Sequence, residues 1–238
     1  DNDFLRDHYN YYNQYITTDA LYHHKSISFR SNPDKPFVVT IGAELAAQFG
    51  GTKRYYKEGV LIDSLTMKSP TRLKDFFKIL FPSSGDGQTN EGDQAYYYGN
   101  HVGQWNLSAE YRFKDNSSVR GYFEWYYDDA SGMGKFNGWD GLWGLEYKSG
   151  KKNWLSNVVL EYLDMTNQSG PLNWCPSDYN DPKLDIEATG ADDYYNNYFY
   201  NGWAHYGLSN GTAMAKSLLY NTDGYMRYKH NRIRGVHL

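Results

Sequence analysis

Glutamates recur along this chain in segments whose residues alternate between apolar and polar, and basic residues accompany them. The acidic residues are Glu44, Glu110, Glu124, Glu146 and Glu161, and the basic ones are Arg112, Arg120 and Lys148. A pair of carboxyl groups can act as the acid and the nucleophile of a glycosidase. Such charges are also usual on the polar side of a strand, so the simpler interpretation is a network of ion pairs. We therefore predict that the protein is not an enzyme.

Five basic residues within eight positions form a second cluster near the end of the sequence. They are Arg227, Lys229, His230, Arg232 and Arg234. Successive residues of a strand point to opposite faces, so this cluster would place charge on both faces. One interpretation pairs these bases with the glutamates. The other is an anion site, for acidic sugars or for lipopolysaccharide phosphate.

A tyrosine-rich stretch precedes the basic cluster. Its aromatic residues are Tyr194, Tyr195, Tyr198, Tyr200 and Trp203. Aromatic faces can stack on sugar rings while the bases neutralise acidic substituents. If the two segments meet, they form one polysaccharide-binding surface. Its candidate residues are Arg227, Lys229, His230, Arg232, Arg234, Tyr195, Tyr198 and Trp203.

The sequence holds none of the usual motifs for nucleophilic catalysis, phosphate binding or dinucleotide binding. His23 and His24 are adjacent, so on a strand they would point in opposite directions and make a poor metal site. Six acidic residues between positions 178 and 193 lack the spacing of a calcium loop. We expect neither a metal ion nor a cofactor.

Alternation between two kinds of side chain is the main structural signal. In the clearest segment, Trp105, Leu107 and Ala109 fall on one face, while Asn106 and Ser108 fall on the other. This pattern predicts strands with one apolar face and one polar face. The predicted strands span residues 21–31, 36–50, 100–114, 118–129, 140–149, 154–165 and 223–238.

Two kinds of protein fit these strands: a soluble sheet with one solvated face, or an outer-membrane barrel with a polar interior. Aromatic residues make up 18% of the chain, which suits both the girdles of a barrel and a sugar-binding protein. The mean hydropathy of −0.79 is polar, yet only half of each spanning strand must be apolar. No run of about 18 apolar residues predicts a membrane helix. We predict an all-β protein, an antiparallel transmembrane β-barrel.

The long connection between residues 51 and 99 contains one predicted helix, near residues 70–80. Ser69 is a plausible N-cap and Pro70 suits the first helical position. Apolar residues recur at helical spacing, which gives the helix one apolar face. Such a helix either packs at the rim of a barrel or blocks its interior. Pro82 is expected to end it.

About seven strands are too few for a complete bacterial barrel, which usually has an even number of eight or more. We therefore expect residues 1–238 to be a single domain and a part of a larger barrel. The net charge of −4 indicates no nucleic-acid partner. The single Cys175 precludes an intramolecular disulfide.

Several stretches resemble the Wzi-like capsule assembly proteins. The final stretch, residues 223–238, is similar to a strand of that family, and residues 194–208 resemble the aromatic loop before it. Residues 121–129 and the helix at 73–80 are similar more loosely. The resemblance covers residues 65–238 and rests on aromatic strings rather than on a catalytic signature.

The resemblance implies an outer-membrane β-barrel of Gram-negative bacteria that holds capsular or other surface polysaccharide in a lectin-like manner, without catalysis. Its partners would be that polysaccharide and the lipid and lipopolysaccharide of the bacterial outer membrane. Two alternatives remain open: a channel for sugars or small solutes, and a soluble β-rich carbohydrate-binding or glycoside hydrolase module.

Overall fold

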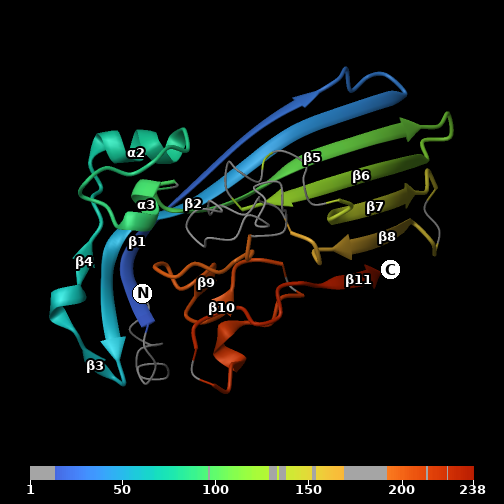
Figure 1. The fold of residues 1–238 in the computed structure, drawn as a ribbon. Coiled ribbons are helices and arrows are strands. Elements are labelled where there is room, and N and C mark those ends of the chain that lie inside the picture. The colour runs from blue at the N-terminus through green and yellow to red at the C-terminus, as the bar shows by residue number, and fades with distance from the viewer. Residues whose placement is uncertain are drawn as a thin grey trace, which may run out of the picture.

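A curved antiparallel sheet dominates the computed structural model (Figure 1), which describes residues 14–95, 97–128, 133, 138–151, 154–168, 192–212, 214–223 and 225–238. Seven strands lie side by side in chain order. They are β1 (Gln14–Arg30), β2 (Phe37–Lys57), β5 (Asn100–Arg112), β6 (Ser118–Tyr127), β7 (Gly141–Lys148), β8 (Asn157–Asp164) and β11 (Arg234–His237). The all-β prediction is confirmed, but the sheet is open, with β1 and β11 at its edges, so a closed barrel is not confirmed.

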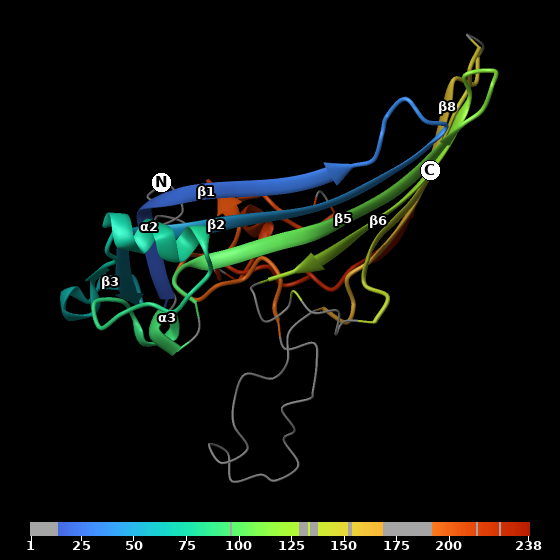
Figure 2. The same ribbon diagram turned by 90° about the horizontal axis from the view of Figure 1, so that it is seen from above.

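Smaller elements lie around this sheet. The short strands β3 (Val60–Leu61) and β4 (Met67–Lys68) pair with β2, while β9 (Ala204–His205) and β10 (Leu208–Ser209) pair with each other. The helices are η1 (Asp63–Leu65), α2 (Leu73–Leu80), α3 (Glu91–Ala95) and η4 (Leu218–Tyr220). Seen from above, the sheet curves along its length, with α2, α3 and β3 gathered at one end and β8 at the other (Figure 2).

The strand register aligns the apolar residues of all seven strands on one face. One row crosses the whole sheet through cross-strand partners: Phe29, Ile41, Leu107, Phe123, Trp143, Tyr162 and Val236. Phe29 and Val236, at the two edges, are each 70% exposed. In the middle, the rings of Phe123 and Trp143 stack with centroids 4.0 Å apart. The sheet therefore presents a continuous apolar face, here called the apolar face.

The opposite face, here called the polar face, carries the predicted ion pairs. Arg112 Nε lies 2.9 Å from Glu110, Arg120 lies 3.6 Å from Glu146, and Lys148 lies 3.1 Å from the same Glu146. Glu44 lies 3.5 Å from His24 and Glu161 lies 3.2 Å from His237, while Glu124 accepts a hydrogen bond from the Tyr126 hydroxyl at 3.3 Å. Among the described residues, the ion-pair interpretation therefore holds for four of the five glutamates, and for Glu44 and Glu161 the partner is a histidine.

Strands β1 and β2 bend together near one end. Asp19 has a φ of +58°, and the facing Gly50 and Gly51 have φ values of +70° and +77°. At Gly51, a Cβ atom would lie 2.6 Å from the carbonyl oxygen of Thr18, so only glycine fits. The bend carries the ends of both strands away from the plane of the sheet, toward the N-terminus in Figure 1.

Helix α2 confirms the predicted helix but is capped differently. Its N-cap is Arg72, and the Asp75 carboxylate accepts a hydrogen bond from the Arg72 backbone N–H at 2.9 Å. Ser69 is not the N-cap; its Oγ accepts a hydrogen bond from the buried Lys53. The helix packs on the apolar face, where Ile79 joins a buried cluster with Ala47 and Phe49.

Residues 192–233 fold over the polar face and build the main core. The buried members of this core are Ile16, Tyr56, Leu163, Met165, Tyr194, Tyr195, Trp203, Ala215, Leu218, Met226 and Tyr228. Partly buried Ala46, Val102 and Tyr126 of the sheet pack against them. Here the prediction of a strand over 223–238 is wrong for most of its length, since only β11 is extended. Met226, Tyr228 and Asn231 are buried in the core instead. Packing in the core therefore sets the conformation of this segment, and pairing with a neighbouring strand does not.

Candidate functional site

Two neighbouring cavities lie between the polar face and residues 194–212. Their volumes are about 550 Å³ and 370 Å³, and both are lined by Ala46, Val102 and Asn210. We call the two together the inner groove. Its walls are the middle of β1, β2 and β5 on one side and the folded-over segment on the other.

Hydrogen bonds hold that segment in place above the sheet. The Asn201 side chain accepts from the Thr17 backbone N–H at 2.8 Å and donates to the carbonyl oxygen of Tyr15, which fixes one end on β1. At the other end, Asn231 Nδ2 donates to the carbonyl oxygen of Tyr194 at 2.7 Å. The side chain of the buried Gln168 also binds Tyr194, because its Oε1 accepts a hydrogen bond from the Tyr194 backbone N–H.

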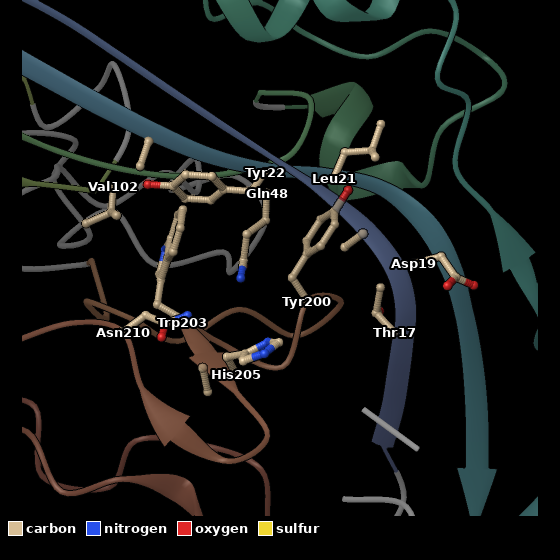
Figure 3. Close-up of a pocket in the computed structure, with 13 residues that line it drawn as sticks. Thr17, Asp19, Leu21, Tyr22, Gln48, Val102, Tyr200, Trp203, His205 and Asn210 are labelled. Atoms are coloured by element: carbon tan, nitrogen blue, oxygen red, sulfur yellow. The ribbon is translucent and has the colours of Figure 1, made fainter. Parts of the chain in front are cut away.

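Aromatic side chains form the larger cavity together with polar ones (Figure 3). Tyr22 extends from β1 and is 65% exposed, whereas Trp203 is 3% exposed. The two rings meet edge to face, with centroids 6.2 Å apart. Figure 3 shows Gln48 beside Trp203, with Tyr200 and His205 on the side toward Thr17. An exposed ring beside amide and imidazole groups offers both a stacking surface and hydrogen bonds.

The smaller cavity is more polar. His24 Nε2 lies 3.5 Å from Glu44, and Glu44 also accepts a hydrogen bond from Asn106 Nδ2 at 2.9 Å. Gln104 and Thr212 complete this wall. Burial raises the pKa of Tyr195, which lines this cavity, to about 12, so its phenol stays neutral near pH 7.

A third cavity, of about 440 Å³, lies elsewhere on the surface of residues 192–233 and brings two predicted site residues together. Tyr198 and Arg227 line it with Asn196, Asn197 and Tyr225. Tyr198 is 61% exposed, and Arg227 lies 3.8 Å from Asp193. We call it the outer cavity. Its lining therefore includes an exposed ring and a guanidinium group that is paired with a carboxylate.

The other basic residues do not join this cavity. Arg234 pairs with Asp164 of β8 at 2.8 Å, and Lys229 pairs with Asp223. Arg232 donates to the carbonyl oxygens of Thr166 and Asn167 at 2.9 and 3.1 Å. His230 is exposed. The contacts described for these bases are with aspartates, backbone carbonyls and the Thr166 hydroxyl, and none of those contacts involves the five glutamates.

The aromatic candidates are likewise separated. Tyr198 lies in the outer cavity, while Tyr195 and Trp203 lie in the inner groove. Sequence reasoning missed the groove residues Tyr22, Gln48 and Asn210. No motif marks them; the one available signal was that Tyr22 and Gln48 lie on the polar side of alternating segments.

A metal site is not evident: within the described ranges, no group of three or more histidine, cysteine, aspartate or glutamate residues is placed to hold an ion. The acidic stretch between 178 and 191 lies outside those ranges. The helices that the structure describes include none with the length and apolar character to cross a membrane.

Comparisons with protein-family models, with curated proteins and with solved structures gave no match to this chain. Function is therefore inferred from the geometry of the site, while a capsule and a bacterial outer membrane follow only from the resemblance in the sequence.

Proposed function

We propose that this protein is a non-enzymatic glycan-binding protein of the bacterial outer membrane, which holds capsular or other surface polysaccharide. The observation that carries this proposal is the inner groove. It combines an exposed aromatic ring, Tyr22, with the uncharged hydrogen-bonding side chains of Gln48, Gln104, Asn210 and Thr212. Sugars present both an apolar ring face and a set of hydroxyl groups, so they match such a site.

The membrane part of the proposal is supported by the apolar face. A soluble protein rarely exposes so continuous an apolar surface, because burying it would be favourable. In a lipid bilayer this apolar row can contact the hydrocarbon chains, while the charged polar face must contact water or other parts of the protein. The separation of the two faces by strand alternation therefore favours a membrane-embedded sheet.

A second candidate is a channel for sugars or small solutes, and the position of α2 bears on it. That helix packs on the apolar face and leaves the polar face free, as a conducting protein would require. Residues 192–233 cover part of the polar face instead, which favours binding over conduction. Conductance in planar bilayers separates the two candidates, since a channel passes current that added glycan blocks, and a binding protein passes none.

The binding proposal is tested by replacing the exposed ring. Detergent-solubilised wild-type protein should bind surface polysaccharide from a capsulated bacterium in calorimetric titration. Tyr22→Ala should weaken binding about tenfold, because about 1.4 kcal/mol of ring contact is lost. Tyr220→Ala is the matched control, since Tyr220 is also exposed but lines neither cavity of the inner groove. Equal binding by both variants would contradict the proposal.

A further inference from the structure

The charges of the inner groove are unlike those expected for a site that binds acidic sugars. Among its described lining residues are two carboxylates, Asp19 and Glu44, and two histidines, His24 and His205, but no lysine or arginine. Glu44 lies within 3.5 Å of His24, so that pair is internally balanced when the histidine is protonated. Among the described groove residues, no base lies within ion-pair distance of Asp19, so the groove is neutral to acidic.

The basic residues of β1 and β2 named next have partners outside the groove. Arg54 donates to Thr18 Oγ1 at 2.8 Å, and Lys53 is fully buried against Asp93 and Ser69. Lys25 donates to the carbonyl oxygen of Ile79 at 2.6 Å, on the other side of the sheet. None of these bases lines the inner groove. An anionic ligand there would meet carboxylates without a compensating guanidinium or ammonium group.

The hydrogen-bonding groups of the groove suit hydroxyl and amide groups instead. In the part of the chain that the structure describes, no side-chain hydrogen bond is found for Tyr22, His205 or Asn210. These phenol, imidazole and amide groups both donate and accept, and a carboxylate such as that of Asp19 accepts from hydroxyl groups. Each cavity also exceeds the roughly 300 Å³ at which ligand sites begin. A chain of linked sugar residues therefore has room to extend from one cavity into the next.

We infer that the inner groove takes an uncharged glycan chain, built of neutral hexoses or N-acetylated hexosamines, and disfavours polysaccharides that bear carboxylate or phosphate groups. This inference rests on the proposed function, because it names the substrate class of the same groove. It also separates the groove from the outer cavity, whose lining includes a guanidinium group, that of Arg227, beside its partner Asp193.

The test compares the two glycan classes on the detergent-solubilised full chain. The neutral probes are oligosaccharides of mannose, glucose and N-acetylglucosamine; the acidic probes are oligosaccharides of galacturonate and mannuronate. We expect wild-type protein to bind at least one neutral probe, and Tyr22→Ala to weaken that binding about tenfold. Raising the salt concentration from about 0.05 M to about 0.5 M should leave this affinity nearly constant, since no charge contact is screened.

A charge variant sharpens the test. Replacing both groove carboxylates, Asp19→Asn with Glu44→Gln, should reduce the preference for neutral over acidic probes about tenfold, because like-charge repulsion is removed. Asp34→Asn is the matched control: Asp34 is exposed in the turn before β2, lines neither cavity, and should leave the preference unchanged.

The outcomes distinguish the inference from the function on which it rests. If acidic probes bind as tightly as neutral ones and Tyr22→Ala weakens the binding of both, the inference is overturned and glycan binding in the groove stands. If only acidic probes bind, and Arg227→Gln weakens that binding while Tyr22→Ala does not, the outer cavity is the glycan site and the inference is overturned. If no probe of either class binds, both the inference and the proposed function fail.

Discussion

Lys53 is the residue on which several elements converge. Its ammonium group is fully buried, lies 3.7 Å from Asp93 of α3 and donates to Ser69 Oγ at 2.6 Å. It also lies 4.3 Å from the ring centroid of Tyr200, in the segment above the groove. Because burying an unpaired charge is costly, this lysine and Asp93 each depend on the other.

Removing one member of this pair is therefore expected to destabilise the folded protein more than removing both. Lys53→Met should lower the free energy of unfolding by about 3–5 kcal/mol, because the Asp93 carboxylate stays buried without its partner. The double variant Lys53→Met with Asp93→Asn should recover most of that loss. Denaturant unfolding of wild-type, single and double variants measures the coupling. A double variant less stable than the single one would show that the pair does not act in this way.

Gly51 gives a second residue-scale prediction, about the bend of β1 and β2. Its φ is +77°, and an added Cβ atom would approach the Thr18 carbonyl oxygen to 2.6 Å. Gly51→Ala should destabilise the fold by about 1–3 kcal/mol through backbone strain and this clash. Gly87→Ala is the control, since an added Cβ atom there meets nothing within 4 Å. Both are measured by thermal unfolding, and equal melting temperatures would contradict the role of Gly51.

At the scale of elements, α2 is held by a charge network at its first turn. Asp86 lies 3.1 Å from Arg72 and 2.8 Å from Lys74, and Arg72 also pairs with Asp75 at 2.6 Å. The hydrogen bond from Lys74 holds the pKa of Asp86 well below its ordinary value, and that from Arg72 lowers the pKa of Asp75. These carboxylates therefore stabilise the folded state only while they are ionised.

This network makes the stability of α2 depend on pH. A carboxyl group whose pKa is lower in the folded state stabilises it fully above the unfolded value, about 4, and loses that effect as the pH falls through the folded value. Hydrogen exchange should show residues 72–90 losing protection below about pH 4, before β5 and β6 do. In Asp86→Asn this loss should be smaller, because one titrating group is gone. Uniform protection across acidic pH would refute the assignment.

Strand alternation explains which elements could be predicted. The strands β5, β6, β7 and β8 lie within three residues of their predicted ends, because each alternates strictly and pairs with its chain neighbour. Strand β1 starts earlier than predicted, since its first residues are held by distant partners such as Asn201. The fold of residues 192–233 depends on similar long-range contacts, including that between Asn231 and Tyr194. No local pattern encodes these contacts, so the inner groove could not be placed from the sequence.

At the scale of the whole molecule, the two faces of the sheet predict opposite responses to the same substitution. Leu107 lies in the middle of the apolar row and Ser108, the next residue, lies on the polar face opposite Tyr122. If the apolar face contacts lipid, Leu107→Arg should cost about 2–4 kcal/mol of insertion free energy, as an arginine does near the bilayer midplane. Ser108→Arg introduces the same charged side chain but on the face that carries the ion pairs, so it should insert nearly as the wild type does. The inserted fraction after refolding into lipid vesicles, measured by protection from added protease, compares the two variants. Equal insertion of both variants, or full solubility of the wild type without detergent, would show that the apolar face does not contact lipid. The protein would then be a soluble glycan-binding sheet.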